Sequence, residues 1–176
     1  MKKILFVISL IIIFSNCSVS QYDYNIKSID SLIVKYEKLH TSIINMKVST
    51  AEIQYEEYKN LEKESKQTLE EYNIENIKDL KFTTDLKKLK RYIKPYMVAH
   101  KKLPIKIKKN IEELESLKSD IKNKKYQEKE IKKYLNEERK LFLNQKNNFI
   151  SLNKNFEECN VLLVNIEKQI QDLKKQ

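Results

Sequence analysis

The last third of the chain carries the clearest pattern of apolar and polar positions. Over residues 107–173, apolar side chains recur at steps that alternate between three and four residues, and 15 of the 20 positions on this spacing are apolar when Cys159 is included. Such a seam is typical of a helix in a coiled coil. We therefore predict one long helix over residues 105–174. Lys124 and Glu128 are consecutive polar members of the seam, and looser packing or a bend is expected there.

The first third carries a second amphipathic pattern, which predicts a helix over residues 26–72. One heptad seam collects the apolar residues Leu32, Tyr36, Leu39, Ile43, Met46 and Ile53. After Ile53 the apolar stripe shifts to another face, which indicates a stutter that locally changes the supercoil. Asn73 and Asn76 are candidate turn residues beyond this helix, because Asn tolerates the left-handed backbone conformation better than most residues.

The segment between these two helices predicts a short middle helix over residues 85–101. Thr83 or Thr84 is a candidate N-cap for it. Pro95 lies inside its apolar pattern and is expected to kink or end the helix. Pro104 suits the first turn of the long C-terminal helix, where the missing backbone N–H costs no hydrogen bond.

Composition narrows the fold class further. The 176 residues include no Gly and only two Pro, and 34% are charged. Because Gly is the usual residue wherever φ must be positive, its absence disfavours hairpin turns, barrels and the Gly-rich loops that bind phosphate. We predict an all-α fold with one elongated domain over residues 26–176, an antiparallel helical hairpin or coiled coil with a short middle helix. A parallel homodimer through the 107–173 seam is the alternative, because one amphipathic helix cannot bury its seam alone.

The N-terminus has the pattern of a secretory leader. Two Lys follow Met1, and residues 4–14 form an apolar run of 11 residues that only Ser9 interrupts. This run is far shorter than the ~20 residues that a membrane-spanning helix needs. Its length and flanks match the apolar core of a signal peptide. We therefore expect the protein to be exported.

Two cleavage sites are open. The small residues Ser18 and Ser20 fit a conventional signal peptidase, which would release a soluble secreted protein that starts at Gln21. The sequence FSNC at residues 14–17 is instead similar to a relaxed bacterial lipobox that ends at Cys17.

The leader as a whole resembles those of spirochaete-type surface lipoproteins, whose chains are similarly rich in Lys and Asn. The resemblance implies a signal peptide over residues 1–16 (to residue 20 with the conventional site) and a tether over residues 17–25. It also implies lipidation of Cys17, with palmitate among the acyl chains. Two or three such chains would hold the protein stably at a bacterial membrane, whereas a single chain would not.

Cys159 is the only other cysteine. It falls on the 107–173 seam, where a free Cys behaves as a small hydrophobic residue. We expect it to be buried. A disulfide with Cys17 in an oxidising compartment is the alternative.

The positive charge of the chain is concentrated in residues 81–109. This segment holds 11 basic residues and one acidic residue, a net charge of +10, whereas residues 21–80 carry a net charge of −4. We predict that the segment binds an anionic glycan, an anionic lipid surface or an acidic protein; export argues against nucleic acid. The alternative is a solvated basic face, partly balanced by the acidic first helix. The candidate binding residues are Lys87, Lys88, Lys90, Arg91, Tyr92, Lys94, Tyr96, Lys101, Lys102, Lys106, Lys108 and Lys109.

The chain shows no pattern of catalytic or metal-ligating residues. His40 and His100 are the only histidines, and neither has the spacing of a metal ligand. Adjacent acidic residues, such as Glu137 and Glu138, point about 100° apart on a helix, so we expect them to line solvated faces rather than a catalytic cleft. The sequence predicts a protein that is not an enzyme and needs no cofactor or metal.

Together these features predict an exported, lipid-anchored helical protein that presents its basic segment at the outer membrane or cell surface. Its partner would be an unknown protein or an anionic glycan or lipid. One alternative is a periplasmic or envelope structural component whose long seam pairs with another coiled coil or another copy. A soluble secreted helical protein is the other.

Overall fold

The computed structural model describes residues 21–72 and 80–175, and this part of the chain is helical without any strand. The expected all-α, elongated antiparallel architecture is confirmed. Cys17, Asn73 and Asn76 lie outside the described residues. The helices are α2 (Gln21–Ile44), α3 (Val48–Glu71), α4 (Lys81–Lys122), α5 (Glu128–Glu157) and α6 (Cys159–Lys174).

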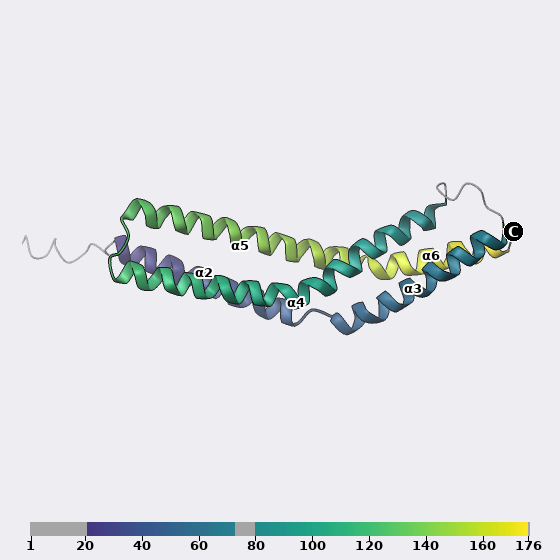
Figure 1. Cartoon of the computed structure of the whole chain (residues 1–176), viewed down its shortest axis with the longest axis horizontal. Helices are drawn as coiled ribbons and strands as arrows, with labels where there is room; N and C mark the ends of the chain where they lie inside the picture. Colours follow the sequence, from purple (N-terminus) through teal and green to yellow (C-terminus); the bar gives the residue numbers. More distant parts are fainter. Residues whose placement is uncertain (1–20, 73–79, 176) are drawn as a thin grey trace, which may run out of the picture.

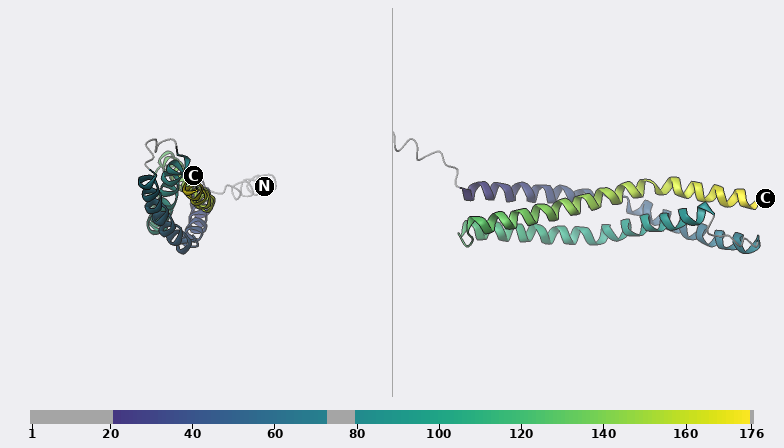
Figure 2. Two further views of the ribbon diagram at one scale, coloured as in Figure 1. Left: turned by 90° about the vertical axis from the view of Figure 1, so that its right-hand side faces the viewer. Right: turned by 90° about the horizontal axis from the view of Figure 1, so that it is seen from above.

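The helices run the length of the molecule in three passes (Figure 1). The first pass is α2 followed by α3, the second is α4 in the opposite direction, and the third is α5 followed by α6. Residue 21 and the turn between α4 and α5 therefore lie at one end, and the C-terminus lies at the other, beside the end of α3 (Figures 1 and 2). The first and third passes run parallel, so the helix that reverses against both of them is α4.

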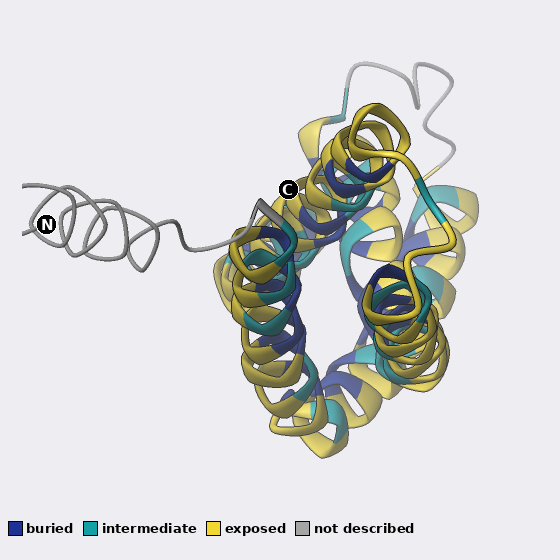
Figure 3. Ribbon diagram, turned by 90° about the vertical axis from the view of Figure 1, so that its left-hand side faces the viewer, coloured by how far each residue is buried: buried dark blue, intermediate teal, exposed yellow. Residues whose placement is uncertain are grey.

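The seam predicted over residues 107–173 is buried inside this single chain. Every seam position in the helices from Ile107 to Ile121 and from Ile131 to Leu173 is buried or half-buried. The parts of the ribbons that carry buried residues face one another between the passes, while the parts that carry exposed residues face outward (Figure 3). Since α4, α5 and α6 bury the seam against each other and against the first pass, it is not free to form the alternative parallel homodimer.

A complete reversal of the chain replaces the bend that was expected at Lys124. After α4, the N–H of Lys124 donates to the carbonyl of Ile121 and the N–H of Lys125 donates to that of Asp120, both at 3.0 Å. These two bonds form a Schellman motif, which needs a left-handed residue at its centre. Lys124 takes that conformation, with φ at 56°. The predicted helix over residues 105–174 is therefore wrong, because the polar gap in the seam is a turn.

The prediction of a short middle helix is also wrong in its bounds, because α4 spans 42 residues and contains both prolines. A proline in a helix interior costs about 3 kcal/mol. Large apolar residues on both sides of the prolines, including Ile93 and Ile107, are fully buried in the same helix. Each contributes about 1.5–3 kcal/mol, so ending the helix would cost more than keeping it. Its path bends midway along its length instead (Figure 1).

Leu80, rather than a threonine, occupies the N-cap position of α4, and no side chain caps this helix. Thr83 lies within the first turn and its hydroxyl donates to the carbonyl of Leu80 at 2.8 Å. The expectation that Thr83 or Thr84 caps the helix is therefore wrong.

The first pass is interrupted earlier than the predicted stutter. The helix predicted over residues 26–72 is two helices, and the break between Ile44 and Val48 rotates the chain that follows. Ala51 and Gln54 are consequently buried, whereas Ile53 is exposed. The seam from Leu32 to Met46 is confirmed, and the placement of Ile53 on it is wrong.

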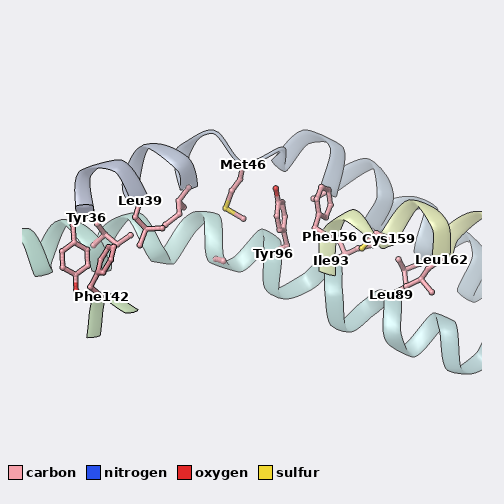
Figure 4. Packing of buried hydrophobic residues seen from close by; sticks show 14 of the residues in the cluster. Tyr36, Leu39, Met46, Leu89, Ile93, Tyr96, Phe142, Phe156, Cys159 and Leu162 are labelled. Atoms are coloured by element: carbon pink, nitrogen blue, oxygen red, sulfur yellow. The ribbon is translucent and has the colours of Figure 1, made fainter. Parts of the chain in front are cut away.

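All three passes change course at one level of the molecule. Tyr96, next to Pro95, stacks on Phe156 with ring centroids 4.0 Å apart, and its hydroxyl accepts a hydrogen bond of 3.1 Å from the backbone N–H of Lys47. Lys47 lies in the break of the first pass, and Phe156 lies just before the interruption at residue 158 in the third. We call Lys47, Tyr96 and Phe156 the central joint; the two stacked rings lie between the passes (Figure 4).

Candidate binding surface

The basic residues of the segment lie along the outer face of α4. Lys87, Lys94, Lys101 and Lys108 are seven residues apart and therefore form one line on the helix, about 10 Å from one to the next. All four are exposed. Lys90, Arg91, Lys102, Lys106 and Lys109 are also exposed on either side of this line. We call these nine side chains, together with Lys88, the basic stripe.

Two apolar side chains lie within the basic stripe. Val98 is exposed and Ile105 is 72% exposed. Together with Arg91 they are spaced seven residues apart, so they occupy the middle of the outer face. Basic side chains around exposed apolar ones suit a partner that combines negative charge with apolar surface. In the sequence, the seven-residue spacing of Arg91, Val98 and Ile105 is the signal that places Val98 and Ile105 on the same face as the basic residues.

Most of the stripe forms no ion pair with the described residues of the chain. Lys88 pairs with Glu158 at 3.0 Å, and Lys109 pairs with Glu113 at 3.5 Å. Among the described residues, the other members form no ion pair with a carboxylate. The acidic helix α3 packs beside α4, but none of the ion pairs among the described residues joins the two helices. Between them there is instead a cation–π contact, in which the ammonium of Lys90 lies 5.9 Å from the ring centroid of Tyr58.

The hydrogen bond to Glu158 raises the pKa of Lys88. Its ammonium group also lies 5.3 Å from the ring centroid of Tyr92, within the range of a cation–π contact. Lys88 is therefore held against the protein, and it is less available to a partner than its exposed neighbours. Tyr92 is half-buried and lies at the edge of the stripe.

Tyr96 does not belong to this surface. It is 2% exposed, and its ring and hydroxyl are both engaged in the central joint. The pKa of the Tyr96 hydroxyl is raised, and burial is the largest cause of this rise. The expectation that Tyr96 contacts a partner is wrong, because the face of α4 that carries residue 96 is turned towards the core.

Glu138 is the exception among the adjacent acidic residues expected on solvated faces. It lies half-buried on the seam of α5, and its Oε2 atom is buried without a hydrogen-bond partner among the described residues. Burial raises the pKa of this carboxyl, and the negative charges of Glu113 and Glu137 raise it further. The neighbouring core is well formed, since Tyr36 packs edge-on against Phe142 at 5.0 Å.

The remaining candidate for chemistry, Cys159, has a structural position. Cys159 is fully buried, as predicted, and burial raises the pKa of its thiol to about 12, with a smaller effect from Glu158. This thiol is protonated at neutral pH and is not a nucleophile. Across the described ranges, no group of three His, Cys, Asp or Glu side chains is placed to hold a metal ion.

Among the described helices, none is both long enough and apolar enough to cross a membrane. Comparison with protein-family models, with curated proteins and with solved structures finds no match to this chain.

Proposed function

We propose that this chain is an exported, lipid-anchored protein whose basic stripe binds an anionic surface, either a sulfated glycan or anionic lipid headgroups, outside the cell. The observation that carries the proposal is a continuous line of exposed Lys residues with no ion pairs in the described structure. Unpaired like charges along one face repel each other, and a polyanion that approaches them gains attraction and relieves this repulsion.

The position of the stripe suits display away from an anchor. The bundle begins at residue 21, four residues after Cys17 in the sequence. The start of α4 lies at the opposite end of the bundle (Figure 1). With acyl chains on Cys17, the half of the molecule that carries Lys87, Lys90, Arg91 and Lys94 would be the half farther from the anchoring membrane.

Charge reversal tests the binding. Replacing Lys87, Lys90, Arg91 and Lys94 by Glu in the chain 21–176 is expected to weaken binding to heparin and to phosphatidylglycerol vesicles by at least about 100-fold, because each basic residue near an anionic surface contributes about 1 kcal/mol. Fluorescence titration measures binding to heparin, and co-sedimentation measures binding to the vesicles. Loss with heparin alone would identify a glycan partner, and loss with vesicles alone a lipid surface.

A matched control separates a specific surface from total charge. Lys122, Lys124, Lys129 and Lys133 are also exposed and form no ion pair in the described structure. They lie at the end of α4, in the turn that follows and at the start of α5, and this turn is at the other end of the molecule (Figure 1). Their replacement by Glu changes the net charge by the same amount and is expected to leave binding within a few-fold of the original. Equal loss in both variants, or loss in neither, would contradict the proposal.

The anchor has its own test. Cells that express the full chain are expected to incorporate radiolabelled palmitate into it, and Cys17→Ser should abolish the label. An unlabelled protein whose first residue is Gln21 would show instead that the leader is removed by a conventional signal peptidase.

A further inference from the structure

A continuous groove runs between the first and third passes, along the side of the molecule away from the basic stripe. Four hollows of about 430, 290, 500 and 450 Å³ follow one another between these passes. Neighbouring hollows share lining residues. Phe142 lines the first and second hollows, Phe149 lines the second and third, and Asn160 lines the third and fourth. We call this feature the pass groove. It exists because α4 lies on the far side of the bundle and covers only one side of the contact between the first and third passes.

One wall of the pass groove carries exposed apolar side chains at helical intervals. Leu143 and Ile150 on α5 are 52% and 51% exposed, and Val164 on α6 is 64% exposed. All three line the groove. Their separations of 7 and 14 residues place them on one face of the third pass. This face is a second, weaker seam that none of the described residues covers.

The charges that line the groove differ in sign at its two ends. Lys35, Lys38, Arg139 and Lys146 line the two hollows nearest residue 21, and no carboxylate lines them. The hollow at the other end is lined by Glu57 and Glu167, without a basic residue.

The third hollow, of about 500 Å³, is neutral and is called the middle hollow below. Lys47 and Glu157 both line it, and its remaining polar side chains are amides and hydroxyls. In the described structure none of the charged residues at the two ends forms an ion pair. Arg139 instead donates hydrogen bonds to Ser28 at 2.5 Å and to Asn136 at 3.4 Å.

From this arrangement we propose that two copies of the chain associate groove to groove, antiparallel, about a two-fold axis that passes through the middle hollow. A two-fold axis places the basic end of each groove against the acidic end of the other. Lys146 lies near the other copy's Glu167, and Ile150 lies near the other copy's Val164. A parallel pair would instead oppose like charges at both ends, which disfavours that arrangement.

The size of this face is adequate for a dimer. From Leu143 to Glu167 the third pass advances about 36 Å, and two adjacent helices present a width of about 20 Å. The product is about 700 Å² per copy, close to the roughly 800 Å² per partner of a stable interface. The contact leaves the basic stripe free, because the stripe lies on the outer face of α4.

A charge-swap series on the chain 21–176 tests the geometry, with sedimentation equilibrium at micromolar concentration as the measurement. The parent chain is expected to be a dimer. Lys146→Glu alone and Glu167→Lys alone should each weaken self-association at least about tenfold, since each brings like charges together twice across the axis. An equimolar mixture of the two variants should dimerise again, because each mixed pair restores both opposite-charge contacts. The double variant K146E/E167K should dimerise on its own.

Two outcomes would overturn the proposal. One is a monomeric parent chain over the whole concentration range. The other is a pair of single variants that fails to associate when mixed, which would show that these residues do not face each other. Ile105→Asp on the basic stripe is the matched control and should leave self-association unchanged. These measurements involve no anion, so they succeed or fail independently of binding by the basic stripe.

Discussion

Replacing Tyr96 by Ala is expected to lower the free energy of unfolding by about 3–5 kcal/mol, the usual loss for a large aromatic side chain in a core. Tyr96 is where the three passes meet. It stacks on Phe156 in the third pass, and its hydroxyl accepts from the backbone N–H of Lys47 in the first. The truncation removes apolar contacts on α4, leaves a cavity, and leaves the Lys47 N–H without its partner.

Two further variants divide this loss into its causes. Tyr96→Phe keeps the stack but removes the acceptor for Lys47, and it is expected to cost about 1–3 kcal/mol. Tyr92→Ala removes a half-buried ring one turn earlier in the same helix and should cost less than about 1 kcal/mol, because little buried area is lost. Urea unfolding followed by circular dichroism measures all three. Equal losses for Tyr92→Ala and Tyr96→Ala would show that the central joint does not hold the passes together.

Replacing Glu138 by Leu is expected to have the opposite effect, a rise of about 1–3 kcal/mol in the free energy of unfolding at neutral pH, which is the usual cost of an unpaired buried polar group. Glu138 lies on the apolar seam with an unpartnered oxygen. Burial is the largest factor that disfavours the charged form of its carboxyl, and the negative charges of Glu113 and Glu137 disfavour it further.

The gain should depend on pH with a defined sign. The pKa of Glu138 in the folded state is raised above its ordinary value of 4.5. Below that ordinary value the side chain is protonated in both states, and the charge penalty is absent. As the pH rises through the raised folded pKa, the parent protein loses stability and the variant does not. The advantage of Glu138→Leu is therefore greatest at neutral pH and shrinks on acidification.

Glu137→Leu is the control for this prediction. Glu137 is the preceding residue on the same helix and is exposed, so its replacement should change stability by no more than about 0.5 kcal/mol. Unfolding curves at several pH values between mildly acidic and neutral compare the two variants. A pH-independent difference between Glu138→Leu and the parent would mean that the carboxylate is not destabilised in the fold.

Local spacing was sufficient to predict most of the residues that are buried on the third pass. Ile131, Leu135, Cys159 and Ile166 were placed on the seam from their spacing, and all four are buried. This succeeds because the period of an α-helix is a local property, and a seam in register with it faces inward whatever lies opposite. The basic stripe was predictable for the same reason, since residues seven apart share a face.

The positions of the turns and helix breaks were harder to predict from the sequence. Lys124 takes a left-handed conformation without the usual Gly or Asn, so its local sequence gave no signal for a reversal. Pro95 indicated a kink or an end of the helix, and α4 continues through it. In both cases the backbone accepts a local cost because contacts with residues far away in the sequence outweigh it.

The sequence by itself determined the all-α class, the inward faces of α2 and of the third pass, the burial of Cys159 and the concentration of basic charge in one segment. Each follows from composition or from periodicity over a few turns. Only the tertiary structure decided that the chain makes three passes, that Tyr96 belongs to the core rather than the surface, and that a groove with opposite charges at its ends lies between the first and third passes. These features depend on which helices pack together, and that choice is made by the total area buried between distant segments rather than by the preference of any one of them.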